Sequence, residues 1–293
     1  MGAGRIERRN FLKAGLGAVV AGLLAWRLWP WARGEAQPAR PPAPAPVAPP
    51  AGLAAVGQLP TDRTRTWLGP AWWANRLQDW RLHQGRLECV AATGPMRTRT
   101  VAVLTRELVA GDGPARIGVR TGLLAGGEGF SGFLVGAGGG RLDHRAAALV
   151  QGASGEGGGI LCTYEADGSV GFREHTDEAR QFAYAPVPGT VRSGQPRPRT
   201  TDEDVELVLE ISPRGRGRFR LTLQATGQDG RRLAGARLDG VSGATLAGGL
   251  ALVSSAREKQ GGARHWFAGL GTAGPKLAER PERARHLRAR VLR

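Results

Sequence analysis

The strongest constraint on this chain is the recurrence of an apolar side chain at every second position in two neighbouring runs. Every second residue is apolar from Val205 to Ile211, and again from Phe219 to Ala225. A period of two is the geometry of a strand, and the Gly/Pro-containing segment 212–217 between the runs is typical of a turn. The pattern therefore predicts an antiparallel hairpin with one buried face. Glu206 and Glu210 fall on the opposite face together with arginines of the second run, which predicts a solvated surface with cross-strand charge pairs.

The same alternation, punctuated by glycine, continues over most of the chain. A second hairpin is predicted at Glu165-Ala-Asp-Gly-Ser169, because Asp-Gly stands there between two strand-like runs. The fold class predicted is all-β, an antiparallel two-sheet sandwich, and the 46 glycines suit its many tight turns. The predicted strands cover residues 86–92, 98–108, 115–123, 132–136, 160–165, 169–173, 204–212, 218–225, 249–254 and 264–268.

The N-terminus carries the pattern of an export signal. Arg8 and Arg9 are followed at fixed spacing by Phe11, Leu12 and Lys13, and then by an uncharged apolar stretch. That arrangement resembles a twin-arginine signal peptide, and the apolar stretch is shorter than the roughly 18 to 20 residues of a membrane-spanning helix. The resemblance implies the twin-arginine export machinery as a partner and a periplasmic or extracellular location.

Two outcomes for the signal remain open. Small residues at Gly34 and Ala36 suit cleavage after Ala36, which would make 1–36 the signal peptide. In the alternative, the segment stays attached as a membrane anchor with its tryptophans at the interface. The membrane is a partner only in that second case.

Composition divides the rest of the chain. Residues 37–60 are a Pro/Ala-rich tract, which predicts a semi-rigid linker. A run rich in tryptophan and apolar residues follows, so the sandwich domain is predicted over 61–275, with a basic tail over 276–293. The formal charge of +16 comes almost wholly from arginine, is spread along the chain and lacks interleaved aromatic residues, which argues against nucleic-acid binding.

Several stretches together resemble one family. They are Trp67-Leu-Gly-Pro-Ala-Trp-Trp-Ala-Asn-Arg-Leu-Gln-Asp-Trp80, Val103-Leu-Thr-Arg-Glu-Leu108 and Gly274-Pro-Lys-Leu-Ala-Glu-Arg-Pro-Glu-Arg-Ala284. The chain is similar over residues 67–284 to the concanavalin/laminin-G-like jelly roll that precedes the catalytic domain in exported alkaline phosphatase D-like proteins. The resemblance implies a downstream phosphatase domain as a partner, yet the sequence ends at Arg293, and its last residues do not resemble the start of that domain.

The remaining residues of the sequence contain no catalytic or metal-binding pattern. The five histidines are scattered, no metal-binding string occurs and calcium is supported by no motif, so no cofactor and no catalytic residue are predicted. The function predicted is therefore a non-catalytic accessory module that binds a ligand, with carbohydrate as the expected class. The alternative is a concanavalin-fold glycoside hydrolase that uses two carboxylates on one strand face, for which Glu206 and Glu210 are the nearest match.

Two sets of residues are singled out for binding or bonding. Asp143, His144 and Arg145 form the best local concentration of polar groups in a loop, and they either bind a ligand or pin the loop through a salt bridge. In the resembling family an Asp-Tyr-Arg is usual at this loop, so His144 is a departure. Cys89 and Cys162 either form a disulfide, which an exported domain permits, or are two separately buried thiols.

Overall fold

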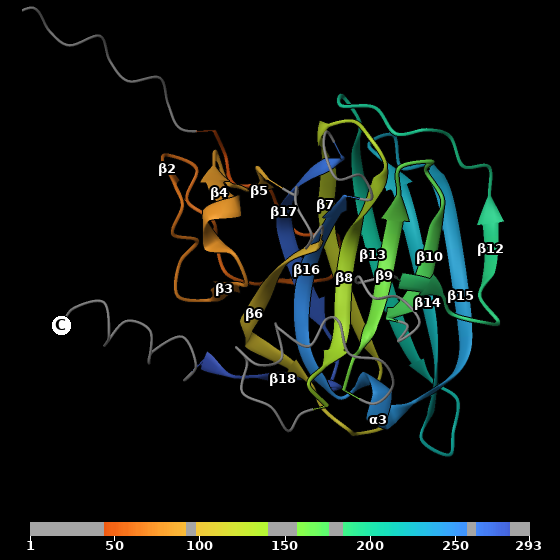
Figure 1. The fold of residues 1–293 in the computed structure, drawn as a ribbon. Helices are drawn as coiled ribbons and strands as arrows, with labels where there is room; N and C mark the ends of the chain where they lie inside the picture. Colours follow the sequence, from red (N-terminus) through yellow and green to blue (C-terminus); the bar gives the residue numbers. More distant parts are fainter. Residues whose placement is uncertain (1–43, 92–97, 140–156, 176–183, 257–261, 282–293) are drawn as a thin grey trace, which may run out of the picture. The chain divides into compact units, whose positions relative to one another are not determined.

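Two antiparallel sheets lie face to face in the computed structural model, which describes residues 44–91, 98–139, 157–175, 184–256 and 262–281. Figure 1 shows strands of one sheet, such as β8 and β16, in front of β13 and β14 of the other. The chain crosses repeatedly between the sheets, as in a jelly roll. The predicted fold class is confirmed.

Each sheet contains strands from several separate parts of the sequence. The ten-stranded sheet contains, in spatial order, β12 (Val191–Gly194), β15 (Arg232–Ser242), β14 (Arg218–Gly227), β13 (Asp204–Pro213), β7 (Ala115–Ala125), β17 (Arg264–Ala273), β5 (Arg86–Cys89), β4 (Trp80–His83) and β2 (Thr64–Arg65), with β1 (Ala54–Ala55) paired to β17. The eight-stranded sheet contains β11 (Tyr184–Pro186), β10 (Val170–His175), β9 (Ile160–Glu165), β8 (Gly129–Ala137), β16 (Gly248–Ala256), β6 (Thr98–Leu108) and β18 (Leu277–Glu279), with β3 (Trp72–Ala74) paired to β6.

Helical structure is slight in the described part of the chain. It consists of a 3₁₀ turn η1 (Leu77–Asp79) and one α-helical turn α3 (Gly243–Leu246), which Ser242 caps by accepting a hydrogen bond from the Thr245 backbone. Within the described ranges, no helix has the length and hydropathy needed to cross a membrane.

Both predicted hairpins are confirmed. β13 and β14 pair in register, with Leu209 opposite Leu223, and the alternating apolar residues of both strands are fully buried. The charge pairs differ from the prediction, because Glu210 contacts Arg116 of β7 at 3.2 Å and Arg220 contacts Asp239 of β15 at 2.5 Å. The charged side chains of β13 and β14 therefore pair with the neighbouring strands β7 and β15, and not with each other.

All the predicted strands are present, although several elements escaped prediction. The longest of these is β15, which pairs with both β14 and β12. Its buried residues include Ala234 and Ala236, whose small side chains give a weak hydrophobic signal, and glycines interrupt the pattern. The short strands at the sheet edges lack the length at which periodicity can be recognised.

The packed sandwich is wider than the predicted range 61–275. The compact unit begins at Ala43, and residues of the predicted linker pack on the ten-stranded sheet through β1 and the buried side chains of Leu53 and Val56. At the other end β18 pairs with β6, and the buried Lys276 donates hydrogen bonds to the carbonyl oxygens of Val109 and Gly111. Parts of the predicted linker and tail thus belong to the folded domain.

Cys89 and Cys162 are free, buried thiols in this structure, on β5 and β9 of different sheets. Burial raises the pKa of the Cys89 thiol to about 11 and raises the pKa of Cys162 even more. Both therefore act as small apolar residues, and no disulfide joins them here.

Candidate functional site

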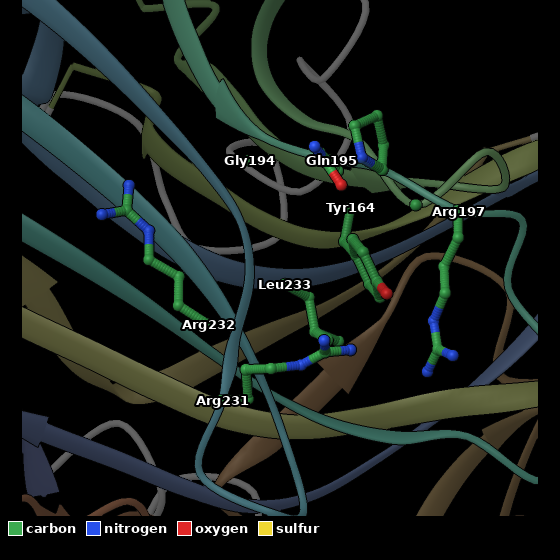
Figure 2. A pocket seen from close by; sticks show the side chains of 9 residues that line it. Tyr164, Gly194, Gln195, Arg197, Arg231, Arg232 and Leu233 are labelled. Atoms are coloured by element: carbon green, nitrogen blue, oxygen red, sulfur yellow. The ribbon is translucent and has the colours of Figure 1, made fainter.

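The predicted loop residues Asp143, His144 and Arg145 lie outside the described residues, and so do the export-signal residues from Arg8 to Lys13 and the predicted cleavage position Ala36. The described structure instead contains a polar cavity of about 480 Å³ at the rim of the sandwich. It is called the rim pocket below, and Figure 2 shows it from close by. Its lining consists of Tyr164, Gly168, Gly194, Gln195, Pro196, Arg197, Arg231, Arg232 and Leu233.

The rim pocket forms where the two sheets approach each other at one edge. Tyr164 and Gly168 come from β9 and the following turn in the eight-stranded sheet. Gly194 ends β12 in the other sheet, and the segment 195–197 continues from it. Arg231 directly precedes β15 of that sheet, and Arg232 and Leu233 begin this strand. Contributions from both sheets explain why no local motif marks this site in the sequence.

Two glycines allow the walls of the pocket to approach closely. Gly168 has φ +81°, and a Cβ atom there would lie 2.0 Å from the carbonyl oxygen of Arg197. Gly194 has φ +96°, and a Cβ atom there would lie 2.6 Å from the carbonyl oxygen of Leu233. Any side chain at either position would push apart the segments that form the pocket.

The floor of the pocket is the Tyr164 ring, which a carboxylate outside the lining holds in place together with Arg197. The Tyr164 hydroxyl donates to Glu203 Oε2 at 3.3 Å, and Arg197 Nη2 donates to Glu203 Oε1 at the same distance. Burial raises the pKa of the Tyr164 phenol, so this group is neutral at physiological pH. Glu203 thereby fixes the aromatic ring and one arginine relative to each other.

A second guanidinium lies beneath the Tyr164 ring. The Cζ atom of Arg199 is 4.2 Å from the ring centroid, and its Nη1 atom donates to Ser131 Oγ at 3.0 Å. Its Nε and Nη2 atoms are buried without a hydrogen-bond partner in the described part of the chain. Burial lowers the pKa of Arg199 to about 10, which still leaves the guanidinium charged at neutral pH.

The remaining arginines stand at the mouth of the pocket. Arg231 is only loosely paired, with 4.0 Å between its Nε and Asp229 Oδ2, and both side chains are about two-thirds exposed. Arg232 donates to Ser193 Oγ at 2.8 Å. In Figure 2 the side chains of Arg197 and Arg231 extend toward the region below the Tyr164 ring, whereas Arg232 points away from it. As far as the structure describes it, this lining carries positive charge and no carboxylate.

The carboxylates of the hydrolase alternative lie elsewhere. Glu206 and Glu210 are half-buried on the outer face of β13, and Glu210 is paired with Arg116, with 43% of each side chain exposed. Neither lines the rim pocket. Over the described ranges, no three His, Cys, Asp or Glu side chains are grouped so as to hold a metal ion.

A polar cluster and a second cavity are present besides the rim pocket. On the outer face of the eight-stranded sheet, Glu165 Oε1 accepts hydrogen bonds from Thr163 Oγ1 at 2.7 Å and from Arg173 Nε at 2.6 Å, so its polar groups satisfy one another. A second cavity of about 310 Å³ is mainly apolar and lies between residues 46–59 and the side chain of Trp72. The rim pocket, by contrast, combines three arginines and the Gln195 amide with the apolar surfaces of Pro196 and Leu233.

Comparisons with known proteins yield structural neighbours only. No protein-family model matches the chain, and no curated protein matches it. The seed lectin of Lotus tetragonolobus has 10% sequence identity and a TM-score of 0.46, over 72% of this chain and 97% of that chain. A carbohydrate recognition domain of Emp46p has 14% identity and a TM-score of 0.45, over 73% and 94% of the two chains. The exoplasmic/lumenal domain of VIP36, in a Ca²⁺/Man3GlcNAc-bound form, has 12% identity and a TM-score of 0.42, over 70% and 84%. At such identities and TM-scores these likenesses carry no conclusion about this chain beyond its own topology, which is an antiparallel two-sheet β-sandwich.

Proposed function

We propose that this chain is an exported, non-catalytic binding module whose rim pocket holds carbohydrate. The observation that carries the proposal is the mixture of groups in the pocket. Guanidinium forks and the Gln195 amide offer paired hydrogen bonds beside the apolar surfaces of Pro196 and Leu233. A sugar ring presents paired hydroxyl groups on its edge and C–H groups on its face, so it matches both kinds of surface.

The size and position of the pocket support the same function. About 480 Å³ lies within the range of small-molecule sites, and the walls come from turns and strand ends held by the two sheets. Such a site is largely formed before the ligand arrives, because Glu203 already fixes Tyr164 and Arg197. Preorganisation of this kind lowers the entropic cost of binding.

The wider context of the module is part of the proposal. The Arg8-Arg9 pattern supports export through the twin-arginine machinery to the periplasm or beyond. The resemblance over residues 67–284 supports an origin as the N-terminal part of an alkaline phosphatase D-like protein. In that setting the module would attach a phosphatase domain, or stand alone, near a polysaccharide surface.

A glycan array containing neutral and acidic oligosaccharides, followed by calorimetric titration of the best ligand, tests this function. We expect binding by the native chain and its loss in Gln195→Trp, because the exposed Gln195 lines the pocket and an indole there would fill it. Gln58→Trp is the matched control, since Gln58 lines the other cavity. Binding that survives in Gln195→Trp would move the site elsewhere, and an array without any bound glycan would refute carbohydrate binding.

A further inference from the structure

The charges around the rim pocket are unbalanced. Three arginines line it, and a fourth, Arg199, lies directly beneath its aromatic floor. Arg197 is paired with Glu203, and the charges of Glu203 and Glu165 also act on Arg199. Arg231 is 4.0 Å from Asp229, and the hydrogen bond from Arg232 goes to a neutral serine hydroxyl. Positive potential therefore accumulates inside the pocket, where the protein walls reduce screening by water.

Arginine in this number indicates a ligand with an oxyanion group. A guanidinium presents its N–H groups as a fork that matches the two oxygens of a carboxylate or the edge of a sulfate group. Arg231 is the best placed of these groups, because its side chain extends toward the Tyr164 ring in Figure 2 and its existing ion pair is weak.

The buried Arg199 adds a positive charge that water screens less than the charges of the exposed arginines. It is 8% exposed, and two of its three guanidinium nitrogens have no hydrogen-bond partner in the described residues. Its nearest aromatic neighbour, Tyr164, separates it from the pocket. Its charge is therefore poorly compensated by hydrogen bonds, and an anion placed above the ring would stabilise it through space.

We infer that the rim pocket is specific for acidic carbohydrate, a saccharide that carries a carboxylate or sulfate group placed between Arg231 and Arg197 beside Tyr164. This inference rests on the proposed function and adds the charge of the ligand to it. A neutral saccharide would fill the same space but would leave Arg231 and Arg232 without a close counter-charge.

Calorimetric titration with a matched pair of probes tests the inference. The acidic probe is a trisaccharide of galacturonic acid, and the neutral probe is its methyl ester, which has the same sugar skeleton. At low salt we expect the acid to bind the full chain at least about tenfold more tightly than the ester, and the preference to shrink in 1 M salt, where the screening length falls to about 3 Å.

Matched variants locate the effect. Arg231→Gln and Arg197→Gln should each weaken binding of the acid by about 3- to 10-fold more than they weaken binding of the ester, as expected for a partly exposed charge pair. Arg216→Gln is the control, because it makes the same change of charge in the exposed turn between β13 and β14. A thermal unfolding curve for each variant confirms that it is folded.

Three other results would each overturn a part of these proposals. If the ester binds as tightly as the acid and Gln195→Trp abolishes both, the pocket binds carbohydrate but the charge inference is wrong. If inorganic sulfate binds as tightly as the acidic trisaccharide, the ligand is a free oxyanion and not a sugar. If a thymidine oligonucleotide binds in an Arg231-dependent way while no saccharide binds, nucleic acid replaces carbohydrate and both proposals fail.

Discussion

At the scale of single residues, the interior of this sandwich contains a polar layer in an otherwise apolar core. Ser131 on β8 lies opposite Ser254 on β16, and both point toward the other sheet. Ser131 contacts Thr121 and Arg199, whereas Ser254 Oγ is 2.9 Å from Nδ1 of His265 on β17. This layer links the floor of the rim pocket to the centre of the domain.

His265 predicts a pH dependence of stability. Complete burial, with a smaller effect of the Arg199 charge, lowers its pKa well below 6.5, so the folded chain keeps the imidazole neutral while the unfolded chain binds a proton. The stabilisation is full above pH 6.5 and is lost below it, by about 1.4 kcal/mol per pH unit. Urea unfolding of the native chain and of His265→Gln at pH 7.5, 6.5 and 5.5 measures this difference.

The substituted protein should lose less stability than the native chain as the pH falls, because it lacks this titrating group. His83→Gln serves as the control, since His83 lies near the surface with its Nδ1 2.8 Å from Thr64 Oγ1. Equal pH dependence in the native chain and in His265→Gln would contradict the assignment of a neutral buried imidazole.

At the scale of elements, glycines in two central strands make room for the Pro-rich segment. Gly118 on β7 and Gly271 on β17 are register partners on the outer face of the ten-stranded sheet. A Cβ atom on Gly271 would lie 2.6 Å from Pro49 Cβ and 2.7 Å from Leu53 Cβ. Because glycine has no side chain, a groove is left on the sheet surface at these two positions, and residues 49–53 pack into it. The composition of this stretch predicts a linker.

Gly271→Ala tests this groove. Because the added methyl group overlaps two side chains of the packed segment, we expect the free energy of unfolding to fall by about 1–3 kcal/mol and residues 44–59 to become sensitive to protease. Gly126→Ala is the control, since no heavy atom lies within 4 Å of a Cβ atom there. Equal urea midpoints and equal cleavage for the two variants would show that the segment is not held by the groove.

At the scale of the whole molecule, the domain is one sandwich with a single continuous main core, to which both sheets contribute. The N-terminal pattern resembles a twin-arginine signal, and that route carries proteins that are already folded. A domain with one main core can fold before such export. The predicted signal lies outside the described residues and shares no residue with the rim pocket.

The predicted export signal can be tested at its paired arginines. Arg8→Lys together with Arg9→Lys should keep the chain inside the cell, because the paired arginines form the recognised feature of the signal. Cell fractionation with immunoblotting measures the distribution, and N-terminal sequencing of the exported form should begin at Gln37. Normal export of the double variant would contradict the twin-arginine assignment, and an intact N-terminus on exported protein would favour the uncleaved anchor.

The sequence by itself determined the fold class, the strands with clear alternation and both hairpins, because period-two burial is a local property that each strand displays in its own residues. Only the tertiary structure decided the rest. β15 carries small residues and glycines, the packing of residues 49–53 depends on glycines that are far away in the chain, and the rim pocket unites Tyr164 with Arg197 and Arg231 from another sheet. These features arise from the way the two sheets meet, and contacts between residues so distant in sequence leave no periodic or motif-like trace.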